Sequence, residues 1–349
     1  MSKTTRIAPP EFWRFVFILF ICFLHFEEDV YDRVHIVANS GYLGVDFFLL
    51  LSGFVVAFNH GLKPIQSAFS YSLSRVRKLY PEFLFAILLM LGLWIIYDNT
   101  FGIKGFIVHL YNTKFQYVFA NALYPTGIEM RSIWFLSYWL IGITVLAATL
   151  RKNWLRIVGA LAISFMSWHV YNRGSLFNDP ANPEWLWSLR LVKCVSEVII
   201  GALAYDLFRH IKDVNFTKLG KCLLSILEVL VIAFTIFVMA RKGRNMLDYE
   251  VCMAFVIIIV LAFMNKTFIS RLLDNKVSLW LGKMSLPIYL YHLFVVKLVA
   301  NNWHNSDNKV LIYTGSLVAI IILSWVSHLF VEKCFKPFLS WVRKKLIVK

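Results

Sequence analysis

The sequence predicts an all-α membrane protein, a bundle of about ten transmembrane helices with both termini in the cytoplasm. First, hydrophobic residues make up 59% of the chain and the mean hydropathy is +0.66, more than soluble proteins carry. Second, apolar runs of about 17 to 22 residues recur, each long enough to cross a bilayer as a helix. Third, Lys and Arg cluster in alternate loops, as the positive-inside rule describes.

The expected spans cover residues 12–27, 42–60, 81–98, 133–150, 154–171, 190–208, 222–240, 248–264, 279–300 and 310–331. With the N-terminus inside, the acidic segment EEDVYDR from Glu27 to Arg33 becomes an outer loop. Only the basic segment 241–244 lands outside against the rule. We therefore expect one domain over residues 1–349, a multi-pass protein of the cell (plasma or inner) membrane.

The net charge of +16 follows the inner loops rather than one surface patch. This distribution argues against nucleic acid as a partner and favours anionic membrane lipids or an anionic cytoplasmic cosubstrate. The five cysteines have no paired spacing and lie in or beside apolar runs. They are typical of small buried hydrophobic residues rather than of disulfides or metal ligands, and no metal is expected.

The first span holds two ionisable residues, Arg14 and His25. Eleven residues are about three helical turns, so both side chains share one helix face, ~16 Å apart along the axis. Ionisable groups inside a membrane indicate a functional site. The structural alternative is that Arg14 extends to the headgroups and His25 is interfacial.

Further polar residues stand in the second and sixth expected spans. Asp46 requires a cationic partner, either Arg14 or the ring of His25. Ser52 and Gly53 fit either helix packing or a closely approaching ligand. Lys193 and Glu197 stand four residues apart, so we expect them to neutralise each other.

A basic inner loop with Arg75, Arg77 and Lys78 precedes Pro81, the expected start of the third span. Arginine side chains match phosphate oxygens, although inner loops are also basic simply to anchor the protein. The two interpretations stay open at this level.

The order of these motifs is more specific than any one of them. Arg14 and His25 precede GVDFFLLLSGF, then RVRKLYP, SIWFLSYWL, SLWLGKMSLPIYLYHLF and VEKCFKPF. This order resembles the acyltransferase-3 family of integral membrane acyltransferases, which O-acetylate surface polysaccharides and related acceptors. The resemblance covers nearly the whole chain, without the extracytoplasmic esterase-like domain that some members carry.

The resemblance implies roles for individual residues. His25 matches the essential histidine and is the expected general base, with Arg14 and Asp46 as further catalytic candidates. The expected donor is cytoplasmic acetyl-CoA, and its candidate contacts are Arg75, Arg77, Lys78, Arg14 and Ser52. The candidates for the substrate cavity are Trp134, Ser137, Tyr289, His292 and Glu332. Many members carry a Glu pair where this chain has Tyr138 and Trp139.

The expected reaction moves an acetyl group to a hydroxyl of a cell-surface or lipid-linked carbohydrate on the other side of the membrane. An acetyl-histidine intermediate is an alternative course of the same transfer. A transporter or flippase of a lipid-linked or small anionic solute, or a non-catalytic scaffold, is the rival function. The acceptor's identity, the acyl chain length and the oligomeric state are left open by the sequence.

Overall fold

The computed structural model describes residues 7–31, 38–65, 67–98, 102–114, 134–177, 189–241, 243–304 and 307–340. Within these ranges the chain is helical and contains no strand. The elements are α1 (Ala8–Tyr31), α2 (Leu43–His60), α3 (Ala68–Tyr97), α4 (Gly102–Thr113), α5 (Trp134–Arg151), α6 (Leu155–Arg173), α7 (Leu189–Ile211), α8 (Lys218–Arg241), α9 (Asp248–Met264), α10 (Phe268–Leu272), α11 (Lys276–Trp303), α12 (Lys309–Phe330) and the π-helical turn η3 (Val331–Phe335).

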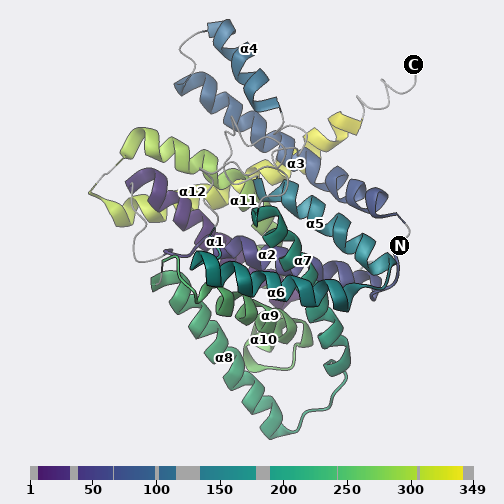
Figure 1. Ribbon diagram of the computed structural model, residues 1–349. Helices are drawn as coiled ribbons and strands as arrows, with labels where there is room; N and C mark the ends of the chain where they lie inside the picture. Colours follow the sequence, from purple (N-terminus) through teal and green to yellow (C-terminus); the bar gives the residue numbers. More distant parts are fainter. Residues whose placement is uncertain are drawn as a thin grey trace.

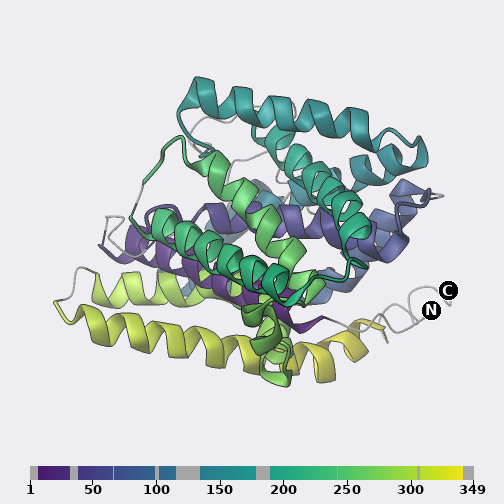
Figure 2. The same cartoon turned by 90° about the horizontal axis from the view of Figure 1, so that it is seen from below.

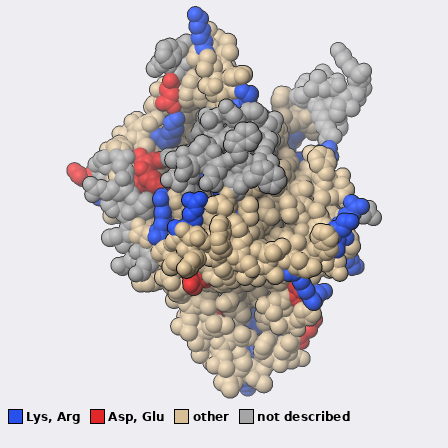
Figure 3. Space-filling model, viewed as in Figure 1, with Lys and Arg blue, Asp and Glu red and all other residues tan. Residues whose placement is uncertain are grey.

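Six of these segments are long and apolar enough to cross a membrane: Ala8–Tyr31, Leu43–His60, Ala68–Tyr97, Lys218–Ala240, Lys276–Trp303 and Lys309–Ser340. Phe135–Arg151 is a shorter apolar helix. Exposed apolar side chains cover the outer faces of α8 and α12, and Figure 3 shows broad uncharged areas between small groups of Lys and Arg. The prediction of an all-α, multi-pass helical bundle is confirmed.

The helices pack in pairs around a core of aromatic residues. The most extensive contacts join α1 to α11 and α2 to α7. Helices α11 and α12 lie side by side along one flank in both orientations, and α8 packs on α9 (Figures 1 and 2). Phe17, Phe47 and Phe255 bring α1, α2 and α9 together, with ring centroids 4.4 to 5.4 Å apart.

Glycines set how closely α2 approaches α7. A Cβ atom on Gly53 would lie 1.8 Å from the backbone oxygen of Val198, and one on Gly201 would lie 1.9 Å from that of Leu50. The two backbones therefore touch, as small residues allow in membrane helices. Of the two interpretations of Gly53, helix packing is the one that its geometry supports.

Two of the boundaries that differ from the sequence prediction change the environment of charged residues. Helix α1 continues to Tyr31, so Glu27 and Glu28 are helical rather than part of an outer loop. Glu27 is tolerated there because its buried carboxylate accepts a hydrogen bond from the Tyr313 hydroxyl (3.1 Å). Helix α3 already begins at Ala68, where the Ser67 side chain caps it by accepting from the Ser70 amide (3.2 Å).

The early start of α3 changes the environment of the basic segment. Arg75, Arg77 and Lys78 stand on a helix and not in a loop, and Pro81 lies inside α3 rather than at its first turn. On this helix Arg75 and Lys78, three residues apart, lie on one side, whereas Arg77 lies on another.

Candidate functional site

A cavity of about 500 Å³ opens between α1, α2, α3 and α5. Its polar lining includes Arg14 from α1, Ser52 from α2, and Arg75 and Lys78 from α3. Four of the five residues predicted for the donor therefore line one cavity. Arg77 does not: its side chain is exposed on another face of α3.

The cavity is positively charged at its mouth. Arg14 is paired with Glu11 at 2.8 Å, one turn earlier on α1. The Arg75 guanidinium donates to the Tyr71 hydroxyl (2.7 Å) and lies 4.8 Å above its ring, which fixes the arginine without neutralising it. With Lys78 the lining holds three cations against one carboxylate, so it favours a polyanion such as a chain of phosphates.

Ser52 and Gly53 are adjacent in the sequence, but they face different neighbours of α2. The Ser52 hydroxyl donates to the Phe48 carbonyl (2.7 Å) on the cavity side. Gly53 faces α7, where it permits the close backbone contact. The pair is therefore one cavity residue and one packing residue.

Asp46 has a partner that the sequence did not suggest. Its Oδ1 accepts from Lys193 Nζ on α7 (2.5 Å), and its Oδ2 lies 3.9 Å from Cys252 Sγ. Lys193 also pairs with Glu197 at 3.2 Å, as predicted. The expectation that Asp46 pairs with Arg14 or orients His25 is wrong, because Lys193 occupies that position.

The resulting triad of Asp46, Lys193 and Glu197 is almost completely buried. Asp46, Glu197 and Cys252 place ligand atoms within 4.8 Å of one another, and the Lys193 ammonium is the cation among them. The triad joins α2 and α7 next to their glycine contacts. This geometry gives Asp46 a role in holding the bundle together.

His25 lies near the other end of α1. Its side chain is 18% exposed, so the ring is not sealed by packing. Its Nδ1 atom is buried, has no hydrogen-bond partner among the described residues and lies 3.5 Å from Glu28 Oε2, one turn further on α1. Glu28 is therefore a neighbouring negative charge of the His25 ring rather than its hydrogen-bond partner.

A second imidazole lies beside the first. The rings of His25 and His292 on α11 are nearly parallel, with centroids 5.5 Å apart. His292 Nδ1 lies 2.7 Å from the Tyr289 carbonyl oxygen, which only accepts, so Nδ1 carries the proton. His292 Nε2 is therefore a lone-pair acceptor, buried and without a hydrogen-bond partner among the described residues.

Aromatic contacts link this histidine pair to the cavity. Tyr289 lies 5.7 Å from His292 and 4.8 Å from Phe135 of α5, centroid to centroid. Trp139, one helical turn beyond Phe135, lines the cavity. Ser137 is buried in the same stretch of α5, and the side chain of Trp134 lies outside the described residues.

Glu332 has no contact with His25 or His292 among the interactions of the described residues. It belongs to η3, where it pairs with Lys336 and is half-exposed. It forms a group with Glu82 of α3 and His328 of α12. Glu82 Oε1 lies 3.2 Å from His328 Nδ1 and 3.5 Å from the Tyr291 hydroxyl. Sequence reasoning placed Glu332 among cavity candidates, whereas these contacts assign it to the junction of α3 with η3.

Sequence reasoning missed Glu28 and Glu82. Glu28 stands three residues after His25, a spacing that brings two side chains together on a helix, but the segment was interpreted as a loop. Glu82 follows Pro81, and its partners are more than 200 residues away in the chain, so no local pattern shows them.

The comparisons with known proteins identify a family for this chain. A family model described as an acyltransferase domain, acyltransferase family 3, matches residues 10–329. No curated protein and no solved structure matches the chain. The matched region contains both the cavity and the histidine pair. The chain therefore belongs to the acyltransferase-3 family and is a membrane acyltransferase.

Proposed function

We propose that this protein transfers an acetyl group from cytoplasmic acetyl-CoA to a hydroxyl of a cell-surface or lipid-linked carbohydrate across the cell membrane. The observation that carries the proposal is the cavity in which Arg14, Arg75 and Lys78 converge from two helices. Arg14 stands on the same helix as His25, so α1 connects a phosphate-binding end to a catalytic end.

The cations supply the donor end of the site. Arg75 and Lys78 would hold the phosphates of the cosubstrate at the inner face, where the positive-inside rule places them. Ser52 and the apolar side chains of Leu51 and Val55 line the interior, where a thin pantetheine arm fits.

The arm must cover ~16 Å along α1 to reach His25. The arm cannot run straight along the face of α1 between Arg14 and His25, because the side chains of Ile18 and Cys22 on that face are buried by packing. The route that the contacts favour runs past Trp139 and Phe135 of α5 to Tyr289 and then to the two histidines. The residues that resemblance assigns to the substrate cavity, Tyr289 and His292, lie on this route.

His25 would act at the carbohydrate hydroxyl. Nε2 accepts the hydroxyl proton as the oxygen attacks the thioester carbonyl carbon, and Glu28 stabilises the imidazolium that forms. When the carbon–sulfur bond breaks, the imidazolium returns the proton to the thiolate, so free CoA and the O-acetyl ester leave. His292, with its Nε2 as an acceptor, is suited to hold the acceptor hydroxyl beside His25.

Purified protein supplied with labelled acetyl-CoA and a surface-glycan acceptor tests the proposal. His25→Ala should lower kcat by about 10² to 10⁴, the usual contribution of a general base. Arg75→Gln and Lys78→Gln should each raise the KM for acetyl-CoA about tenfold or more, because each removes a charge-assisted contact. The matched control is Lys152→Gln, an exposed cation between α5 and α6 that lines no described cavity.

Two results would contradict this function. If the His25→Ala protein still transfers acetyl groups at equal protein level, His25 is not the general base. An intact protein that moves a labelled anionic solute across vesicles without acetyl transfer would favour a transporter instead.

A further inference from the structure

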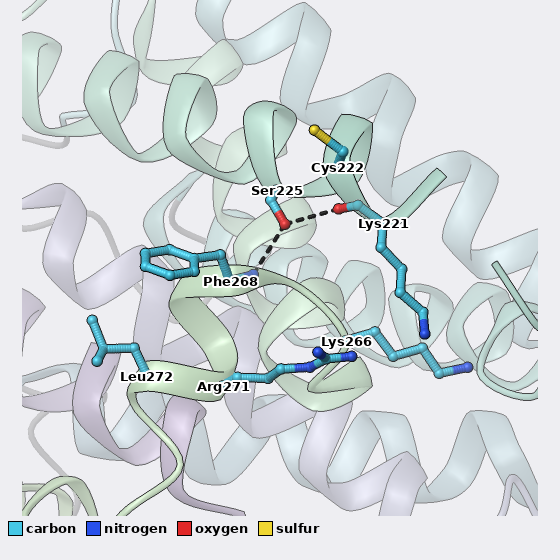
Figure 4. Close-up of a pocket in the computed structure, with 7 residues that line it drawn as sticks. All are labelled: Lys221, Cys222, Ser225, Lys266, Phe268, Arg271 and Leu272. Atoms are coloured by element: carbon cyan, nitrogen blue, oxygen red, sulfur yellow. Dashed lines mark hydrogen bonds between the residues drawn. The ribbon is translucent and has the colours of Figure 1, made fainter. Parts of the chain in front are cut away.

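A second basic pocket, separate from the donor cavity, lies where α8 meets α10. It encloses about 380 Å³ and is lined by Lys221, Cys222, Ser225, Lys266, Phe268, Arg271 and Leu272 (Figure 4). Hydrogen bonds build it: Ser225 Oγ donates to the Lys221 carbonyl (2.8 Å) and accepts from the Phe268 amide (3.0 Å). Nothing in the proposed reaction uses this pocket.

The pocket opens at the same end of the bundle as the donor cavity. Phe263 of α9 lines the donor cavity, and Lys266 follows it by three residues. Lys266 Nζ donates to the carbonyls of Lys212 (2.5 Å) and Val214 (2.9 Å), just beyond the end of α7. The pocket therefore belongs to the face that carries Arg75 and Lys78, the predicted cytoplasmic face.

The charge of the pocket is not compensated. None of its seven lining residues is acidic. Among the described residues, neither Lys221 nor Arg271 has a side-chain hydrogen bond or an ion pair, and the nearby Asp274 accepts instead from Asn265 (2.6 Å). Lys266 is bonded only to neutral carbonyls and keeps its charge. Three positive charges with free donors are the chemistry that binds phosphate oxygens.

The other half of the pocket is apolar and open. Phe268 and Leu272 are 69% and 66% exposed, and the neighbouring Leu219 and Leu223 on α8 are also exposed. Figure 4 shows the basic side chains extending to one side of the pocket and Phe268 and Leu272 to the other. Inorganic phosphate has no apolar part to cover this half of the pocket, whereas a phospholipid has both a charged head and apolar chains.

We propose that this pocket binds an anionic glycerophospholipid of the inner leaflet. The phosphate lies between Lys221, Lys266 and Arg271, and the acyl chains run along Phe268 and Leu272. The site goes beyond acetyl transfer and does not depend on it, because binding is measured without any turnover.

Native mass spectrometry of the purified protein tests the site, with equal amounts of phosphatidylglycerol and phosphatidylcholine of matched chains added in detergent. Wild-type protein should retain more phosphatidylglycerol than phosphatidylcholine. Lys221→Gln and Arg271→Gln should each reduce that preference about fivefold, the value expected for one charge at an anionic lipid surface. Lys152→Gln, which removes an inner-face charge elsewhere, should leave it unchanged.

Equal retention of the two lipids by wild-type protein would overturn the proposal, as would a preference that persists in the Lys221→Gln, Arg271→Gln double variant. Excess CoA or inorganic phosphate should not displace the lipid; displacement would assign the pocket to a soluble phosphate instead. Folding of the variants is verified by the reaction of the buried thiols of Cys194 and Cys252 with a maleimide dye on heating, in protein whose exposed Cys222 and Cys334 are replaced by Ser. If the double variant fails to fold, the two single variants decide the result.

Discussion

The contact between α2 and α7 makes the most quantitative prediction, through the substitution Gly53→Ala. The added Cβ would lie 1.8 Å from the Val198 carbonyl oxygen, and ordinary contact begins at 3.4 Å. The helices must therefore separate locally by about 1.6 Å, the difference of those two distances. The obstacle is backbone, so no side-chain rotation relieves it.

The expected cost is at the upper end of overpacking, about 3 kcal/mol. The separation also affects the buried ion pair of Asp46 and Lys193, which spans the same two helices at 2.5 Å. Thermal unfolding followed with a maleimide dye measures the effect once the exposed Cys222 and Cys334 are replaced by Ser, because Cys194 and Cys252 are fully buried and react only on unfolding. The unfolding midpoint of Gly53→Ala should fall clearly below that of wild type.

Gly92→Ala is the matched control. Gly92 is also a helical glycine, on α3, but a Cβ there meets nothing within 4 Å. Since Ala favours a helix more than Gly does, the midpoint should stay equal or rise slightly. A Gly53→Ala protein that melts with wild type would refute the close α2–α7 contact.

Four further predictions address the ionisable groups and the donor cavity. Lys193→Met should lower stability by about 3 to 5 kcal/mol, because Asp46 and Glu197 lose their buried cation; an unchanged unfolding midpoint would contradict this. Ser52→Leu should fill part of the cavity and raise the KM for acetyl-CoA without lowering the midpoint, and an unaltered KM would exclude Ser52 from the donor path. Activity should fall at acidic pH because His25 must be neutral to accept a proton. Glu28→Gln should reduce kcat more than it changes KM, because the neutral amide no longer stabilises the imidazolium that forms in the reaction; an unchanged kcat would exclude that role.

Much of the helical architecture could be predicted from the sequence. Apolar length predicts most spans, because a membrane helix must satisfy its backbone within itself and present apolar side chains to lipid. The boundaries of α1 and α3 were missed for a related reason. Charged residues suggested loops at Glu27 and Arg75, but both segments are helical. Glu27 bonds to Tyr313 of α12, a tertiary partner, and Arg75 bonds to Tyr71 one turn earlier on α3 itself.

The candidate site, too, could be predicted only in part. The spacing of Arg14 and His25 on one helix face follows from helical geometry alone. The resemblance supplied His292 and Tyr289, which the structure brings next to His25. Neither helical geometry nor the family resemblance predicted that Arg77 lies outside the cavity that Arg75 and Lys78 line.

The sequence by itself determined that this chain is a helical membrane protein with ionisable residues inside its spans, since hydropathy and helical periodicity are local properties. Only the tertiary structure decided which charges meet. Asp46 pairs with Lys193, 147 residues away, and not with Arg14 or His25. The physical reason is that the pairing depends on which helix faces touch, and the reciprocal contacts of Gly53 and Gly201 set those faces at the α2–α7 crossing.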